Sequence, residues 1–268
     1  MNQVSIILEK MGHSGPSLDA LNPVKYTLGE LDLSAHVGKF IRLEFTGECN
    51  CIHCGRPIKK TFQQGYCFPC FQTLAQCDSC ILKPETCHFR HGTCREPEWA
   101  KGHCLIEHVV YLANTTGLKI GITRRGQELT RWGDQGALQA VVLAIVPERY
   151  VAGLLEVDMK GQVPDKTSWQ KLLKGEFQKV DLLSERERVR GLVSPRYQEF
   201  LVQDSSFDRV FEFHYPVEQY LSKAKTHNFD KDRIIEGTLS GIHGQYLFIG
   251  DAALNVRKFG GYKIVLSF

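Results

Sequence analysis

Four cysteines stand in two closely spaced pairs, an arrangement typical of metal ligands. Two residues intervene within each pair and twelve separate the pairs; the four are Cys51, Cys54, Cys67 and Cys70. Two thiolate pairs on tight turns close the tetrahedral coordination of a structural zinc ion. Four buried free cysteines would not explain the paired spacing. The pattern therefore predicts a structural zinc site, with Cys49 as a spare thiol or a substitute ligand.

A second group of cysteines follows, with histidines interspersed. The cysteines are Cys77, Cys80, Cys87, Cys94 and Cys104, and the histidines are His88, His91, His103 and His108. A second zinc ion is expected here, but the spacing does not fix its ligands. Cys80, Cys87 and Cys94 are preferred, with Cys77 or Cys104 as the fourth. Each histidine taken singly is more often a hydrogen-bonding structural residue than a ligand.

Neither cysteine group is expected to catalyse a reaction. A catalytic zinc ion keeps an open position for water and usually has histidine or carboxylate ligands. Closure by four thiolates instead suits a scaffold.

The distribution of cysteine and charge limits the class of protein. All ten cysteines lie between Cys49 and Cys104, whereas a secreted disulfide protein would more often spread them over the fold. Glu9 and Lys10 interrupt the opening apolar run, and the sequence has no uninterrupted apolar run of about 18 residues. We therefore expect a cytoplasmic protein without a membrane segment. The net charge of +3 is too small to indicate nucleic acid by itself.

The pattern after the cysteines predicts a small mixed domain. Residues 108–113 (HVVYLA) and 118–123 (LKIGIT) are apolar runs joined by NTTG, which indicates a hairpin. Residues 127–132 are a short helix candidate, residues 138–146 (LQAVVLAIV) a buried strand, and a helix is expected from Pro147 to about residue 159. The expected order is hairpin, helix, strand, helix.

These elements resemble the GIY-YIG nuclease superfamily, which includes homing endonucleases and the incision subunit of bacterial nucleotide excision repair. Tyr111 matches the tyrosine of the first motif, and Gly121 matches the glycine of the second. Arg131 stands at the helix position of the family arginine, and Glu156 falls where the family has its metal-binding glutamate. The resemblance covers roughly a fifth of the chain and implies a hairpin–helix–strand–helix core.

The sequence also departs from this family. Val109 and Val110 replace the Gly-Ile of the first motif, and Lys119 replaces the tyrosine of the second, as in divergent branches with a KIG form. The chain as a whole also resembles a bacterial family of unknown function that joins a cysteine-rich module to a region reading YLA, KIGIT, RW and DQGA.

The resemblance implies a site for phosphodiester cleavage. Glu156 would hold one Mg²⁺ or Mn²⁺ ion, and Arg131 would bind the negative charge that develops in the transition state. Tyr111 would take the proton of an attacking water if cations such as Lys119 lowered its pKa. Asp134 and Gln135, in the GDQGA turn, would face the same site. Taken singly, each residue also has an ordinary reading as a strand residue or solvated helix charge.

Basic residues near these elements favour nucleic acid as a partner. The candidates are Arg124, Arg125, Trp132, Lys59 and Lys60. Arginine beside an aromatic side chain suits phosphate contact and base stacking. Ordinary solvated charge is the alternative for such clusters.

The fold class predicted is α+β, with four segments. Residues 1–48 are expected to form β strands, 49–107 a zinc-binding module, 108–203 a GIY-YIG-like core with a helical extension, and 204–268 a small antiparallel sheet or barrel. The function predicted is nucleic-acid binding, with or without metal-dependent endonuclease activity on RNA or DNA. The alternatives are an inactive nucleic-acid-binding factor and a zinc-stabilised scaffold that docks a protein partner.

Overall fold

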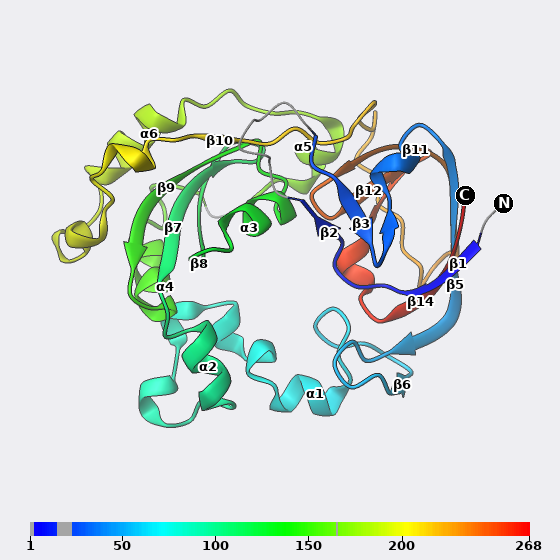
Figure 1. Cartoon of the computed structure of the whole chain (residues 1–268), viewed down its shortest axis with the longest axis horizontal. Helices are drawn as coiled ribbons and strands as arrows, with labels where there is room; N and C mark the ends of the chain where they lie inside the picture. Colours follow the sequence, from blue (N-terminus) through cyan, green and yellow to red (C-terminus); the bar gives the residue numbers. More distant parts are fainter. Residues whose placement is uncertain (1–2, 15–22, 165) are drawn as a thin grey trace. The chain divides into compact units, whose positions relative to one another are not determined.

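The computed structural model describes residues 3–14, 23–164 and 166–268, and the chain divides into two compact units (Figure 1). Unit 1 contains Met1–Gln72, Trp169–Glu176 and His214–Phe268. Unit 2 contains Thr73–Ser168 and Phe177–Phe213. The four paired cysteines therefore belong to unit 1, and the later cysteines belong to unit 2.

Unit 1 is built on an antiparallel sheet that joins both ends of the chain. Among the described residues its strand order is β1-β14-β5-β11-β12-β13, with β6 paired to β5. The strands are β1 (Gln3–Ile7), β5 (Phe40–Asn50), β6 (Pro57–Ile58), β11 (Ile234–His243), β12 (Tyr246–Ile249), β13 (Ala252–Asn255) and β14 (Tyr262–Ser267). Alternate side chains such as Leu43, Ile264 and Leu266 are buried, as expected for a sheet with one face in the core. The predicted antiparallel β structure is confirmed.

Smaller elements complete unit 1. A second sheet contains β2 (Gly12–His13), β3 (Tyr26–Leu28) and β4 (Leu31–Asp32). Helix α5 (Trp169–Lys174) buries Leu172 and Leu173 against Phe248 of β12. Residues 253–259 (ALNVRKF) are only partly a strand, because residues 256–259 form a 3₁₀ turn capped by the side chain of Asn255.

Unit 2 has a four-stranded antiparallel sheet in the order β10-β9-β7-β8. Its strands are β7 (His108–Asn114), β8 (Leu118–Arg124), β9 (Gln139–Val146) and β10 (Phe211–Glu212). Helices α3 (Glu128–Asp134) and α4 (Arg149–Asp158) flank β9 in sequence, and α6 (Leu182–Arg190) follows. The cysteine-rich part carries α1 (Phe68–Thr73), which crosses the unit boundary, and α2 (Pro97–His103). The chain thus has the predicted order of hairpin, helix, strand and helix.

The two faces of this sheet have different partners. Val110 and Leu112 of β7 pack in one hydrophobic core with Leu155 of α4 and Val189 of α6. Because side chains alternate along a strand, Tyr111 points to the opposite face. There its ring meets Trp132 of α3, with the centroids 5.7 Å apart. The sheet therefore separates an apolar layer from the layer that contains Tyr111.

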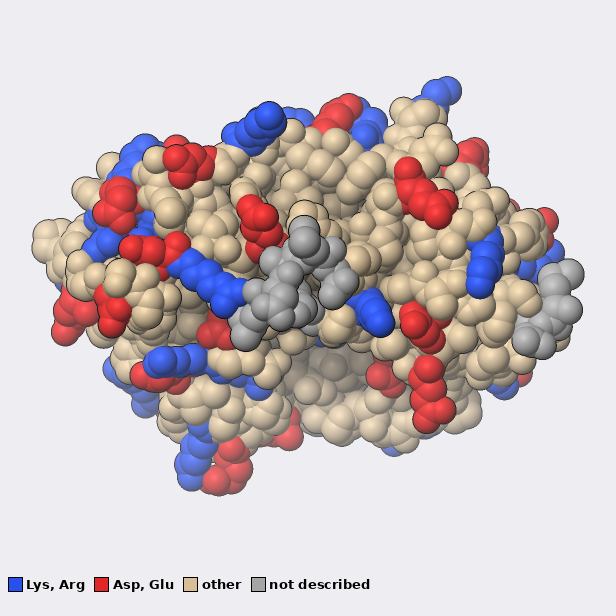
Figure 2. All heavy atoms as spheres, turned by 45° about the horizontal axis from the view of Figure 1, so that its top comes forward, with Lys and Arg blue, Asp and Glu red and all other residues tan. Residues whose placement is uncertain are grey.

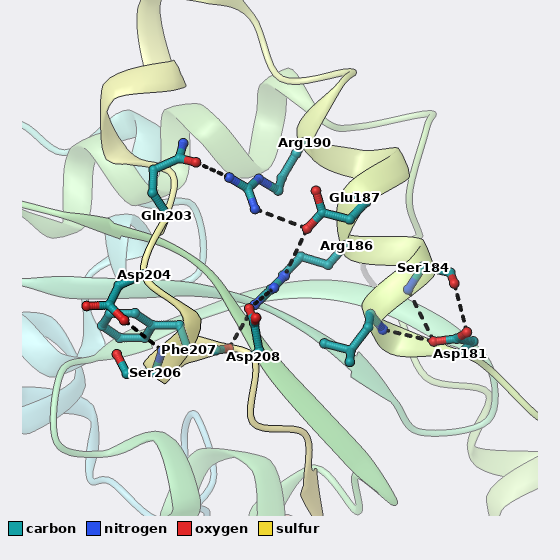
Figure 3. A network of polar contacts seen from close by, with 11 residues as sticks. Asp181, Ser184, Arg186, Glu187, Arg190, Gln203, Asp204, Ser206, Phe207 and Asp208 are labelled. Atoms are coloured by element: carbon teal, nitrogen blue, oxygen red, sulfur yellow. Dashed lines mark hydrogen bonds and ion pairs between the residues drawn. The ribbon is translucent and has the colours of Figure 1, made fainter.

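Helix α6 is more than the solvated charged face that its sequence indicates (Figure 3). Arg186 is 4% exposed, and its Nη1 donates to the carbonyl of Phe207 at 2.8 Å. Its other terminal nitrogen pairs with Asp208. Asp181 caps the helix by accepting from the backbone N–H of Leu183 and Ser184. Buried charge is tolerated here because both terminal nitrogens have partners, and the network fixes the segment that leads into β10.

No helix in the described part of the chain has the length and apolar character needed to cross a membrane.

Candidate functional site

The paired cysteines converge on one point in unit 1. The sulfur atoms of Cys51, Cys54, Cys67 and Cys70 all lie within 4.8 Å of one another. The Sγ atoms of Cys54 and Cys67 are 3.8 Å apart. Two sulfurs bound to one tetrahedral zinc ion at about 2.3 Å are separated by about 3.8 Å. The four-cysteine cluster therefore has the donor set and spacing for a metal ion such as zinc.

Backbone N–H groups favour the thiolate form of two cysteines in this cluster. Burial opposes ionisation of Cys51, but N–H groups of Cys54, Cys67 and His53 lower its pKa to about 6. The N–H of Arg56 lowers the pKa of Cys54. Burial and the neighbouring thiols instead raise the pKa of Cys70 to about 12. A bound dication would hold all four as thiolates, because its charge outweighs these local effects.

Two glycines permit the turns that carry the cysteines. Gly55 adopts a positive φ of 72° and returns its N–H to the carbonyl of Cys51 at 2.9 Å. Gly65 has φ 134°, and a Cβ there would lie 2.8 Å from the side chain of Ile52. Larger residues at either position would strain the loops that hold the sulfurs.

The later cysteines surround a small cavity in unit 2. Cys80, Cys87, Cys94 and Cys104 line it, together with Asp78 and His88. Ligand atoms of Asp78, Cys80 and His88 lie within 4.8 Å of one another. The lining, all of it within the described chain, does not include Cys77. Of the predicted candidates, the structure thus brings together four cysteines and His88, and it adds the carboxylate of Asp78, which the sequence did not indicate.

Buried polar atoms gather around Tyr111. Its hydroxyl, Arg131 Nε, Trp132 Nε1 and Gln135 Oε1 are buried and lack a hydrogen-bond partner among the described residues. A Cβ on Gly121 would lie 2.7 Å from the Tyr111 hydroxyl, so only glycine leaves room for it. Unpaired buried polar atoms are costly and rare, and a concentration of them indicates a functional site. Tyr111, Gly121, Arg131 and Gln135 therefore lie together in unit 2.

The expected activation of Tyr111 is wrong. Burial raises the pKa of Tyr111, and Arg131 and Gln135 oppose that rise only in part. Arg131, rather than the predicted Lys119, is the chief cation that acts on the hydroxyl. Lys119 is itself buried in β8. Tyr111 therefore remains a neutral phenol that can donate a hydrogen bond.

Glu156 of α4 influences the residues around Tyr111 and also lines a cavity. It interacts electrostatically with both Tyr111 and Arg149. It also lines a cavity of about 510 Å³ with Lys83, Glu85 and Lys160. A carboxylate beside lysines in an accessible cavity can take a hydrated divalent ion next to a phosphate.

Arg149 is a site residue that sequence reasoning missed. Its Nη2 donates to the carbonyl of Ile81 at 2.7 Å, while its Nε is buried without a partner in the described structure. Burial lowers its pKa, Arg131 adds to that effect, and Cys104, Cys80 and Glu156 oppose it. Its place at the start of the predicted helix was the only available signal, because its burial depends on a turn 68 residues earlier.

His108 makes the stability of unit 2 sensitive to acid. Burial lowers the pKa of His108 from 6.5 to about 4. Unfolded chains take up this proton below about pH 6.5, whereas the folded protein resists until about pH 4, so stability falls as the pH decreases through this window. We expect a loss of up to about 3 kcal/mol between pH 7 and pH 4 from this residue.

Urea unfolding at pH 7 and pH 5, followed by tryptophan fluorescence, measures this effect. His108→Phe should show a smaller acid-induced loss than wild type, whereas a variant of the exposed His91, His91→Asn, should match wild type. Equal pH dependence in wild type and His108→Phe would contradict the assignment.

The residues predicted to contact nucleic acid differ in their exposure. Trp132 is 1% exposed and packs against Tyr111, Phe211 and Phe213, so the prediction that it stacks on bases is wrong. Arg125 is exposed and paired with Glu107 at 2.6 Å. Arg124 is half-buried.

The two predicted lysines lie in the other unit. Lys59 and Lys60 are exposed in unit 1, with Lys60 over the ring of Phe62. Lysine and arginine are interspersed with acidic residues on the face shown in Figure 2. Specific phosphate contacts, rather than a broad basic surface, must therefore carry any binding on this face.

Comparisons with known proteins identify a family but assign no activity. Neither curated proteins nor solved structures give a match. A family model described as "Protein of unknown function (DUF2797)" matches residues 38–264, which is most of the chain. The prediction of a domain-of-unknown-function family is thereby confirmed, and the chain belongs to the DUF2797 family.

Proposed function

We propose that this chain is a zinc-containing nucleic-acid-binding protein whose β7–α4 segment is a GIY-YIG-like core with a divalent-metal-dependent phosphodiesterase site. The order of hairpin, helix, strand and helix supports the core. The observation that supports the function is the electrostatic coupling of Arg131 and Glu156 to Tyr111. The three residues come from three different elements, and both Arg131 and Glu156 also act electrostatically on Arg149.

Independent surface residues would have no reason to meet in this way. If Tyr111 were only a strand residue, and Arg131 and Glu156 only solvated helix charges, the three side chains would not interact. Instead, the Tyr111 hydroxyl and Arg131 Nε are both buried, and Arg131 acts directly on Tyr111. An anionic ligand would satisfy such donors at little reorganisation cost.

Each residue has a role in phosphodiester hydrolysis. Arg131 and Arg149 would hold the nonbridging phosphate oxygens and offset the charge that grows as water attacks phosphorus. Neutral Tyr111 would donate a hydrogen bond to the same group. A divalent ion bound by Glu156 would polarise the phosphate and stabilise the departing oxygen as its bond to phosphorus breaks, and the proton lost by the attacking water would reach that oxygen through solvent.

A second candidate function is nucleic-acid binding without cleavage. Tyr111 is fully buried and its pKa is raised, so the tyrosinate that would take a proton from water is disfavoured. This observation favours an inactive core that retains its phosphate contacts.

Gel-shift and cleavage assays on single- and double-stranded DNA and RNA separate the candidates. Zinc-loaded protein with Mg²⁺ or Mn²⁺ should bind at about 100 mM salt and cut at least one substrate class, and omission of the added ion should stop the cutting. Salt-sensitive binding without cutting identifies the inactive factor. Absence of binding on every substrate contradicts both and leaves the protein-docking scaffold.

A further inference from the structure

We propose that the cysteine-lined cavity of unit 2 is a second metal centre. In it, Cys80, Cys87, Cys94 and Cys104 bind a structural zinc ion through four thiolates. These cysteines come from separate turns and from the end of α2, yet all four line one cavity. The cavity volume is only about 10 Å³. That space suits a single ion and excludes an organic ligand.

The surrounding segment needs such a ligand in order to hold its shape. Apart from cysteines, the strongly buried apolar side chains of the fully described residues 73–107 are Leu74, Ala75, Pro84 and Ala100. A chain of short 3₁₀ turns with so small a core cannot offset its conformational entropy by apolar burial alone. A structural metal is the usual remedy in small modules.

The charges around the cavity also fit a metal–thiolate centre. Four thiolates and one Zn²⁺ ion carry a net charge of about −2. The backbone N–H of Arg149 donates to the carbonyl of Cys104 at 2.8 Å, and its guanidinium is held by Ile81 of the same turn as Cys80. The buried positive charge of Arg149 therefore balances the negative charge of a metal–thiolate centre. If the thiols were neutral, no negative charge of the cysteines would balance it.

Asp78 and His88 are the competing ligands, but both are already engaged. Asp78 accepts from His88 Nε2 at 3.2 Å and from Arg95 Nε at 2.9 Å. The other ring nitrogen of His88 lies 2.8 Å from Thr93 Oγ1. These residues therefore brace the loops around the cysteines, and the thiolates remain as the donors.

The centre also supports helix α4. A Cβ on Gly153 would lie 2.6 Å from Pro84, so the turn between Cys80 and Cys87 packs directly on this helix. Arg90 of the same segment pairs with Glu148, just before α4 begins. Metal loss should therefore loosen the helix that carries Arg149 and Glu156.

The test is metal content, which is independent of the proposed function. Purified protein is dialysed against metal-free buffer, and bound zinc is measured by mass spectrometry for wild type, Cys94→Ser, Cys77→Ser and His88→Ala. We expect two zinc ions per chain for wild type, Cys77→Ser and His88→Ala, and one for Cys94→Ser. Cys94 is the chosen ligand because it is only half-buried, which limits misfolding.

Cobalt substitution of the wild-type protein measures the number of metal sites without any variant. Two equivalents of Co²⁺ should bind, and both should give thiolate charge-transfer and tetrahedral d–d absorption. A single equivalent in wild type would overturn the proposal. Retention of both zinc ions by Cys94→Ser, or loss of one by His88→Ala, would overturn the four-thiolate ligand set.

Discussion

Cys67→Ser is expected to release the metal of the four-cysteine cluster and to destabilise unit 1 by about 4 kcal/mol or more. Metal binding to such sites contributes on the order of 10 kcal/mol to folding, and three sulfurs retain only part of it. The cluster fixes a loop in which the backbone N–H of Ile52 donates to the carbonyl of Gly65 at 2.9 Å, and Gly65 lies close to Gly260, just before β14. Zinc content and thermal unfolding measure the two effects.

Cys49→Ser is the matched control for this change. Cys49 is also buried in unit 1 but lies outside the cluster, so its variant should keep its full zinc content. If Cys67→Ser also kept all its zinc, the cluster would not be the metal site.

Glu156→Gln is expected to lower the rate of metal-dependent cleavage about 10²- to 10³-fold while leaving nucleic-acid affinity within about twofold. A loss of this size corresponds to several kcal/mol of transition-state stabilisation by a metal ion. Affinity should be kept because the substitution removes a negative charge and spares both arginines. Single-turnover cleavage and titration on the same substrate measure the two quantities.

Glu199→Gln, on an exposed residue of unit 2 outside the cavity, is the control for the loss of one carboxylate. It should cut at the wild-type rate. Equal rates in wild type and Glu156→Gln would remove Glu156 from the chemistry.

Features set by local spacing could be predicted from the sequence. The two CxxC pairs indicated one cluster, because a turn of four residues places two sulfurs together regardless of the rest of the fold. The hairpin, helix, strand and helix of unit 2 followed from the change in apolar periodicity. Helix α3 continues through Gly133 and Asp134, beyond its expected end, because tertiary packing of Trp132 outweighs the helix-breaking glycine.

Features set by distant contacts could not be predicted. Trp132 looked like a stacking surface beside Arg131, but Phe211 and Phe213, 79 and 81 residues later, bury it. Arg186 looked solvated within a charged run, yet the carbonyl of Phe207 draws it inward. Neither partner leaves a signal near the residue concerned.

The candidate site shows the same division. Tyr111, Gly121, Arg131 and Glu156 were identified as candidates through a resemblance of motifs. In the structure Gly121 lies against the Tyr111 hydroxyl, and Arg131 and Glu156 act on Tyr111 electrostatically. The neutral state of Tyr111 depends on complete burial beneath α3, which the motif does not encode. The position of Arg149 depends on the cysteine-rich turns.

The most direct test of the account is the affinity of a labelled oligonucleotide for wild type, Arg131→Ala and Arg188→Ala, measured by anisotropy without Mg²⁺ or Mn²⁺. Both variants lose one positive charge, but Arg188 is exposed and paired with Glu185 on α6. If the cluster around Tyr111 binds phosphate, Arg131→Ala should weaken binding about 10-fold or more, and Arg188→Ala less than about twofold. Equal effects of the two variants, or no effect of Arg131→Ala, would contradict the account.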